Sequence, residues 1–258
     1  MNEDLLYEVK DRVAYLTIHR EASRNAISQE MIAAFLDDLD RADQDDAVRA
    51  VCITAAGDKV FCSGADLGIA FADQGGDRLI GARKYAQLMK RLARFGKPLV
   101  ARVNGTCVAG GLGLILSCDI VIARNDVHFF TPEINVGIFP MMIGVLLCRD
   151  LPRKKVMEMV LTGRRIPAAE AEKIGLITRA VDPERLDTEV QETLRRLASK
   201  SPIAVRLGKD AYRVMSDMAF DQAVDYLCDA LGKVLSTEDA VEGMMAFMEK
   251  REPNFKGK

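Results

Sequence analysis

Two loops rich in small residues are the first candidates for chemistry. Residues 61–67 read FCSGADL and residues 103–113 read VNGTCVAGGLG. Small residues let a backbone approach a ligand closely, and the free N–H groups at a helix start favour negative charge. One N–H group from each loop would form a pair suited to a developing oxyanion. The alternative interpretation is two tight turns that allow helices to pack closely on a sheet.

Glu133 is the candidate acid/base group. It lies in the segment TPEI, residues 131–134, and its apolar neighbours are Phe129, Phe130, Ile134 and Val136. Removal of a carboxyl from water raises its pKa toward the range useful for proton transfer. Alternatively, Pro132 and Glu133 are simply the first turn of a helix, where proline and negative charge are both favourable.

The sequence lacks the residue patterns of several other common sites, namely nucleotide-binding loops, the serine hydrolase motif and metal centres. The glycine-rich run fits neither the dinucleotide-binding nor the P-loop spacing, and no G-x-S-x-G motif occurs. The six cysteines contain no C-x-x-C pair, and the two histidines, His19 and His128, are far apart in the sequence. These features argue against a zinc or di-iron site and favour free thiols in a reducing compartment. A serine or cysteine hydrolase that uses one of the histidines stays open.

The elements that must position these residues alternate in the first half of the chain. Apolar runs predict strands at 13–18, 50–53, 99–103 and 120–123. Helical spacing predicts a helix after Ser28, another over about 78–95, and a third after the glycine-rich run. Strands separated by helices indicate βαβ units and a mainly parallel sheet. The fold class is therefore α/β.

The second half is mostly helical. A short helix is predicted over 168–173, with Pro167 as its start signal and Gly175 as its stop signal. From Pro183 onward, apolar stripes recur at helical spacing. The stripes are Leu186/Val190/Leu194/Leu197, Phe220/Val224/Leu227/Leu231 and Ala240/Met244/Phe247. We expect an α/β core over residues 1–180 and a helical region over 181–258.

Composition fits a globular protein of ordinary type. The 258 residues are 49% apolar and 29% charged, with a net charge of −2. This balance gives no basic field to hold a nucleic acid. The acidic N-terminus resembles no targeting segment, and no 18-residue apolar run occurs. The expectation is a cytoplasmic protein that binds neither nucleic acid nor membrane.

Taken together, the motifs resemble the crotonase (enoyl-CoA hydratase/isomerase) superfamily. In the order of that family they read HREASRNA at 19–26, FCSGADL at 61–67, VNGTCVAGGLG at 103–113, CDI at 118–120, TPEI at 131–134, VLTG at 160–163 and AFMEKR at 246–251. The resemblance covers the chain from about residue 7 to the end. It implies a spiral of ββα units, a C-terminal helical trimerisation region, and homotrimers that often pair into hexamers.

The resemblance also implies acyl-CoA substrates, with coenzyme A as part of the substrate and no separate cofactor or metal. The thioester carbonyl would lie between the backbone N–H groups of Ala65 and Gly110, which stabilise an enolate. Loss of one such donor costs about 100- to 1,000-fold in rate.

Coenzyme A would lie along residues 23–26 and 63–67. Arg24 is then the candidate phosphate contact, because guanidinium groups suit phosphate oxygens, although an ordinary solvated arginine is as good an interpretation. Asp66 has a structural alternative, since a carboxylate after a tight turn often binds nearby amides. The complete set of substrate-binding candidates is Arg24, Ala26, Ser63, Gly64, Ala65, Asp66, Leu67, Thr106, Val108, Gly110, Pro132 and Glu133.

One position departs from the hydratase pattern. Hydratases of the family use two glutamates, and the first belongs three residues after Gly110, where this chain has Gly113. The second is present as Glu133. A proton shift between carbons needs only one base, so Glu133 alone favours double-bond isomerisation over hydration.

Two alternatives remain at this point. The protein is a 2-enoyl-CoA hydratase with a substitute for the missing glutamate, or an acyl-CoA-binding protein whose catalytic pair has degenerated. Hydrolysis, decarboxylation and dehalogenation of acyl-CoA are less favoured relatives. Phe139, Met141 and Met142 favour an apolar acyl pocket, or else they pack in the core or a subunit interface.

Overall fold

A six-stranded sheet forms the centre of the protein in a computed structural model that describes residues 3–65 and 79–258. The strand order is β1-β2-β3-β5-β7-β10. The strands are β1 (Leu5–Lys10), β2 (Val13–Ile18), β3 (Ala50–Ala55), β5 (Leu99–Val103), β7 (Ile120–Arg124) and β10 (Arg179–Val181). Only the β1–β2 pair is antiparallel in this sheet; its other pairs are parallel. The predicted parallel sheet is confirmed.

A second, smaller sheet has the order β4-β6-β8-β9. Its strands are β4 (Val60–Cys62), β6 (Thr106–Val108), β8 (His128–Phe130) and β9 (Ile166–Pro167). Along the chain β3 leads to β4, β5 to β6, and β7 to β8, so each passage through the large sheet is followed by one through the small sheet. This repeat is the spiral arrangement that the sequence resemblance implied.

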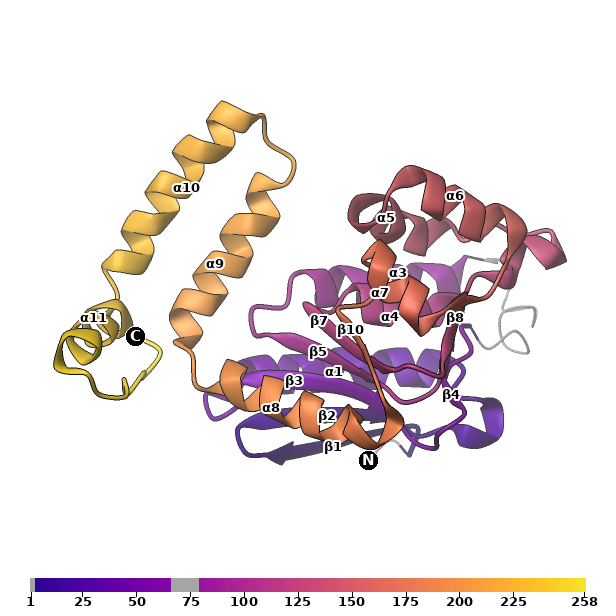
Figure 1. Cartoon of the computed structure of the whole chain (residues 1–258), viewed down its shortest axis with the longest axis horizontal. Coiled ribbons are helices and arrows are strands. Elements are labelled where there is room, and N and C mark those ends of the chain that lie inside the picture. The colour runs from indigo at the N-terminus through magenta and orange to yellow at the C-terminus, as the bar shows by residue number, and fades with distance from the viewer. Residues whose placement is uncertain (1–2, 66–78) are drawn as a thin grey trace.

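Helices cover both faces of the large sheet (Figure 1). The helices of the α/β part are α1 (Gln29–Gln44), α3 (Ile80–Ala93), α4 (Gly110–Leu116), α5 (Met141–Asp150), α6 (Arg153–Thr162), α7 (Ala168–Ile174) and α8 (Leu186–Ala198). The α1 helix starts where predicted, because the Ser28 hydroxyl accepts a hydrogen bond from the Met31 amide at 3.0 Å. Its buried face, Met31, Phe35 and Leu39, joins the main core.

The α8 helix closes the opposite face of the sheet. Leu186, Val190 and Leu194 pack there in a separate cluster with residues of β2, β3, β5 and β7. The short 3-10 helices are η1 (Glu21–Ser23), η2 (Pro132–Val136) and η3 (Pro183–Arg185). Because α8 belongs to the sheet's packing, the division near residue 180 stays a prediction.

Three helices project to one side of this core (Figure 1): α9 (Pro202–Met215), α10 (Phe220–Leu235) and α11 (Glu238–Glu249). Two ion pairs tie α9 to the core, Arg206–Asp43 at 2.6 Å and Lys209–Asp119 at 2.5 Å. The C-terminal helical region is therefore present. None of the helices within residues 3–65 and 79–258 is long and apolar enough to cross a bilayer.

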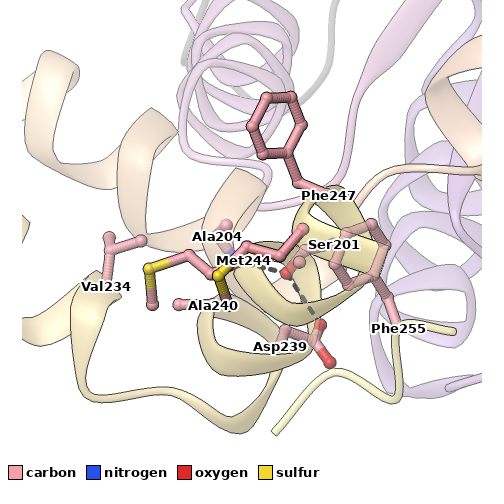
Figure 2. Close-up of a pocket in the computed structure, with 10 residues that line it drawn as sticks. Ser201, Ala204, Val234, Asp239, Ala240, Met244, Phe247 and Phe255 are labelled. Carbon is pink, nitrogen blue, oxygen red and sulfur yellow. Dashed lines mark hydrogen bonds between the residues drawn. The ribbon is translucent and has the colours of Figure 1, made fainter. Parts of the chain in front are cut away.

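An apolar hollow lies among these projecting helices (Figure 2). Its lining includes Ala204 of α9, Val234 of α10 and Met244 of α11, with Phe255 of the following segment. At its edge the Ser201 hydroxyl donates to Asp239 at 2.7 Å. No candidate site residue lines this hollow.

Candidate active site

Three loops leave the same edge of the small sheet. Strands β4, β6 and β8 are parallel neighbours, so their carboxyl ends lie side by side. The segments that follow them are residues 63–65, 109–110 and 131–133, which carry most of the predicted site residues. Loops that follow parallel strands are a common place for active sites.

The first two loops touch each other. Gly64 has φ +92°, and a Cβ there would lie 2.7 Å from the Ala109 Cβ and 3.2 Å from the Gly110 nitrogen. A Cβ on Gly110 would in turn lie 3.7 Å from the Ala65 nitrogen. The structure therefore brings together the two predicted oxyanion donors, and only glycine at position 64 allows this approach.

The turn before α4 holds an unusual backbone conformation. Ala109 has φ +51° and ψ −125°, a region that non-glycine residues rarely occupy. Its amide donates to the Phe130 carbonyl of β8 at 3.0 Å. Such strain persists where the surroundings fix the backbone, and here it sets the direction in which the Gly110 amide points.

The predicted coenzyme A segment lies beside the first loop. The Ser63 amide donates to the Arg24 carbonyl at 3.2 Å, and the Ile27 amide to the Gly64 carbonyl at 2.8 Å. The Arg24 side chain is exposed, and Ala26 is buried. Arg24 is therefore available to a ligand at the surface.

Asn25 supports this segment, and sequence reasoning gave it no role. It has φ +54° and is buried, and its amide group donates to the carbonyls of Ala56 and Val60 at 3.1 and 2.7 Å. The residue type itself was a usable signal of a tight turn, because asparagine tolerates the left-handed conformation better than most residues.

Glu133 is the second residue of the 3-10 helix η2, directly after Pro132, with which the helix begins. The carboxyl is half-buried, and its Oε2 atom is buried without a hydrogen-bond partner among the described residues. This burial raises the pKa of Glu133, opposed by a weaker hydrogen bond from its own backbone. Glu133 thus lies in the first turn of a helix, as the alternative interpretation has it, and its apolar surroundings raise its pKa as expected; its role as acid/base stays a prediction.

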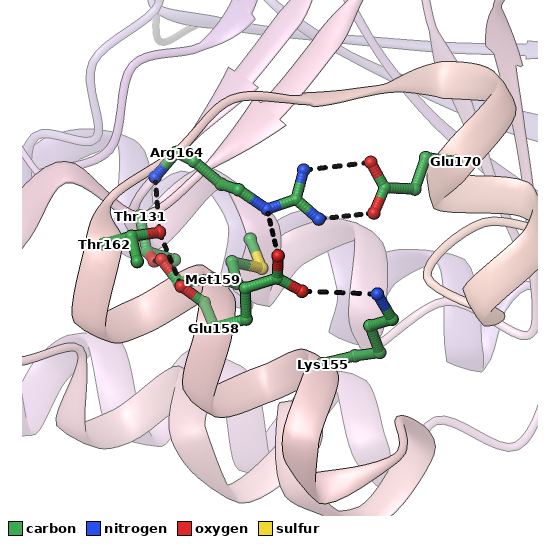
Figure 3. A network of polar contacts seen from close by, with 7 residues as sticks. All are labelled: Thr131, Lys155, Glu158, Met159, Thr162, Arg164 and Glu170. Atoms are coloured by element: carbon green, nitrogen blue, oxygen red, sulfur yellow. Dashed lines mark hydrogen bonds and ion pairs between the residues drawn. The ribbon is translucent and has the colours of Figure 1, made fainter.

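A polar network joins the elements that follow η2 in the chain (Figure 3). Arg164 makes a two-pronged ion pair with Glu170 and a second pair with Glu158 at 3.3 Å. Glu158 also pairs with Lys155 at 3.2 Å. The network joins α6, the following loop and α7, against which the buried Thr131 is placed through a 3.4 Å hydrogen bond to the Met159 carbonyl. It fixes the wall from which η2 projects.

Tyr85, on the buried face of α3, is the second residue to which the sequence analysis gave no role in the site. It is buried, and its hydroxyl donates to the Gly110 carbonyl. A Cβ on Gly113 would collide with the Tyr85 Oη and lie 2.9 Å from Ile143 Cγ2. The tyrosine ring thus occupies the space into which a side chain at position 113 would project.

Not every predicted residue lies at this edge. Val108 ends β6 and leads directly into the Ala109 turn, whereas Thr106 lies at the other end of that strand, where its amide donates to the Lys59 carbonyl. Asp66 and Leu67 lie outside the described residues.

The cysteines near the site are unsuited to nucleophilic chemistry. Cys62 and Cys107 are buried neighbours on β4 and β6. Burial raises the pKa of Cys62 to about 12, so its thiol stays protonated at neutral pH. Within the described ranges, no three His, Cys, Asp or Glu side chains gather as a metal ion would require.

Comparison with known proteins decides the family. The family model described as Enoyl-CoA hydratase/isomerase matches residues 8–258. The chain belongs to this family. The resemblance inferred from the motifs is thereby confirmed.

Relatives within the enoyl-CoA hydratase/isomerase family match over nearly the whole chain. A crotonyl-CoA hydratase of Syntrophomonas wolfei is 35% identical over 261 residues, covering 98% of each protein. A carnitinyl-CoA dehydratase of Escherichia coli K12 is 36% identical over 267 residues, covering 100% of each. The crystal structure of an enoyl-CoA hydratase of Mycobacterium smegmatis has a TM-score of 0.94 at 32% identity, over 98% of this chain and 99% of that one.

Proposed function

We propose that this member of the enoyl-CoA hydratase/isomerase family shifts the double bond of an enoyl-CoA thioester, with Glu133 as its single acid/base residue. The Ala65 and Gly110 amides hold the thioester oxygen. Glu133 removes a proton from the α carbon of a 3-enoyl thioester, the negative charge moves to the thioester oxygen, and the same proton returns to C4. The product is the 2-enoyl thioester, and no water is consumed.

The observation that carries this proposal is the state of Glu133. It combines a half-buried carboxyl, an oxygen without a hydrogen-bond partner and a raised pKa, at the strand edge shared with the two amides. A carboxyl in such surroundings is a base with access to a substrate proton. At position 113 the chain offers no second carboxyl.

The acyl group is expected to be apolar. Val136, Ile138, Phe139 and Met142 follow Glu133 and are 68%, 43%, 36% and 37% exposed, respectively. Exposed apolar side chains in a row are characteristic of a surface that binds apolar groups. We infer that they contact the acyl chain, while Arg24 contacts a phosphate of coenzyme A.

A second candidate function is hydration of 2-enoyl-CoA. It is favoured by relatives that are named as hydratases and a dehydratase. Hydration would need a group other than residue 113 to activate water. The catalytically degenerate acyl-CoA-binding protein stays a third candidate, which the missing glutamate alone supports.

One experiment separates these functions. Short- and medium-chain 2-enoyl- and 3-enoyl-CoA are incubated with the protein in water enriched in heavy oxygen, and the products are analysed by mass spectrometry. Unlabelled double-bond migration supports the proposal, whereas a labelled 3-hydroxyacyl product supports hydration. Binding without any product across the chain-length panel supports the binding protein.

We further propose that the protein assembles as a trimer or a pair of trimers through α9–α11. Apolar side chains on these helices are exposed, including Phe220 at 80%, Phe247 at 85% and Met248 at 73%. Exposed apolar surface of this extent is typical of a contact with another protein chain.

A further inference from the structure

Tyr85 and Gly113 are fitted to each other across two helices. Tyr85 comes from α3 and Gly113 from the first turns of α4, and both are buried. A Cβ at position 113 would collide with the tyrosine hydroxyl and lie 3.2 Å from Tyr85 Cζ. With tyrosine in this place, position 113 has room for a hydrogen atom only.

The Tyr85 hydroxyl has one proton, and that proton is used in a hydrogen bond. It is donated to the carbonyl of Gly110, the residue whose amide is one of the two proposed oxyanion donors. Burial raises the pKa of Tyr85 well above its ordinary value, and the negative charge of Glu133 raises it further. The phenol is therefore neither a base nor a free acid at neutral pH, so it is no substitute for a glutamate.

We propose that Tyr85 is a positioning and specificity-determining residue: it orients the Gly110 turn through its hydrogen bond, and it excludes a second carboxyl at position 113. This inference rests on the proposed one-base reaction. Because Tyr85 fills the position where a second carboxyl would have to stand, the acyl-CoA site works through Glu133 alone. Glycine at position 113 is then a consequence of the tyrosine.

The test compares Tyr85→Phe, Gly113→Glu and the double variant Tyr85→Ala/Gly113→Glu with the wild type, using 3-enoyl- and 2-enoyl-CoA in heavy-oxygen water. Tyr85→Phe keeps the ring and loses the hydrogen bond, so kcat for isomerisation falls about 3- to 10-fold with little change in KM. Tyr15→Phe is the matched control, because Tyr15 of β2 packs against the cluster under α8 and not against the site, and its kcat stays unchanged.

The double variant provides the decisive measurement. Removing the ring makes room for a carboxyl, so labelled 3-hydroxyacyl-CoA rises at least about 10-fold over the wild-type background. Gly113→Glu alone gives no such rise and melts at a lower temperature, because its side chain meets the tyrosine. The inference is overturned if Gly113→Glu alone forms labelled product as fast as the double variant does.

Two further readouts keep the test interpretable. If the double variant does not fold, as its melting curve would show, the Tyr85→Phe result decides, and an unchanged kcat overturns the inference. The proposed function is tested separately in the wild type and in Glu133→Gln. The proposed function fails if isomerisation continues in Glu133→Gln. That result is independent of how much labelled product the two variants with Gly113→Glu form.

Discussion

Glu133 is held in a surrounding that favours its neutral form, although its work as a base requires the charged form. Burial raises its pKa, and in the part of the chain that the structure describes its Oε2 atom has no hydrogen-bond partner to stabilise the charge. A carboxylate of this kind is more basic than one in water and is therefore a better proton acceptor. The same surroundings mean that the ionised Glu133 lowers the stability of the folded protein at neutral pH.

Replacement of this carboxyl by an amide tests its role in the reaction. Glu133→Gln keeps the shape of the side chain and removes the base, so kcat is expected to fall about 100- to 10,000-fold while KM changes little. Steady-state kinetics on the best enoyl-CoA substrate measures both constants. Glu192→Gln, exposed on α8 at the opposite face of the sheet, is the control and keeps its activity; full turnover in Glu133→Gln would contradict the assignment.

The dependence of kcat/KM on pH follows from the direction of the shift. Because the pKa of Glu133 in the free enzyme lies above its ordinary value of 4.5, the active carboxylate is lost as the pH falls through that raised value. The acid limb of kcat/KM is thus displaced to higher pH than an exposed glutamate would give. A pH–rate profile with its midpoint at or below 4.5 would contradict the effect of burial.

Stability should depend on pH in the opposite sense. The folded-state pKa is raised above that of the unfolded chain, so the carboxyl favours folding only at low pH, and this contribution is lost as the pH rises through the folded-state value. Glu133→Gln should therefore raise the melting temperature near neutral pH, and the gain should shrink toward about pH 4. Thermal melting of both proteins across pH measures this; a gain independent of pH would exclude the ionisation of Glu133 as its cause.

At the scale of elements, the site depends on how closely the β4 loop and the α4 turn approach each other. Gly64→Ala places a Cβ 2.7 Å from the Ala109 Cβ and forces a positive φ on alanine. We expect a loss of about 1–3 kcal/mol in stability and a fall in kcat, because the two amides are pushed apart. Denaturant unfolding and steady-state kinetics measure the two effects.

Gly81→Ala is the matched control for this substitution. Gly81 lies within α3, its φ is not positive, and a Cβ there would meet nothing within 4 Å. Alanine should stabilise the helix by about 0.5–1 kcal/mol and leave kcat unchanged. Equal effects of the two substitutions would show that the Gly64 conformation is not needed.

Some elements were predicted closely from the sequence, and others were missed. The strand over 99–103 and the helix capped by Ser28 were predicted closely, because an apolar run and helical spacing marked them, whereas β1, α5 and α6 were not predicted. Strands β4, β6 and β8 have three residues each, too few for alternation to show. Their pairing depends on residues about 20 to 45 positions apart, which local patterns do not reveal.

The site was likewise predicted in part. The pairing of one N–H group from each loop was predicted from their small residues, and the resemblance to a family assigned these groups to Ala65 and Gly110. The role of Tyr85 was not predicted, because an aromatic residue on a helical stripe looks like any other core residue. The hydrogen bond of its hydroxyl to the Gly110 carbonyl becomes visible only in the structure, where α3 lies against α4.

At the scale of the whole molecule, the three helices that project from the core predict an oligomer. Light scattering at micromolar concentration should give about three or six times the mass of the single chain. Phe247→Lys should reduce that mass, because Phe247 is 85% exposed and its replacement adds charge to the expected interface. The chain itself should stay folded by circular dichroism.

Leu161→Lys is the control for this prediction. Leu161 is 55% exposed on α6 of the core, away from α9–α11, so its replacement should leave the mass unchanged. A single-chain mass for the unaltered protein would contradict assembly through these helices.

The fit between Tyr85 and Gly113 also bears on how such a site can evolve. A carboxyl cannot be acquired at position 113 while the tyrosine remains, whereas a smaller residue at position 85 first opens the space at the expense of one hydrogen bond. The two substitutions are therefore epistatic, and their order matters: the helix that never touches the reacting bond must change first. Divergence between one-base and two-base descendants of such a protein would then begin in α3, before any acidic residue appears in α4.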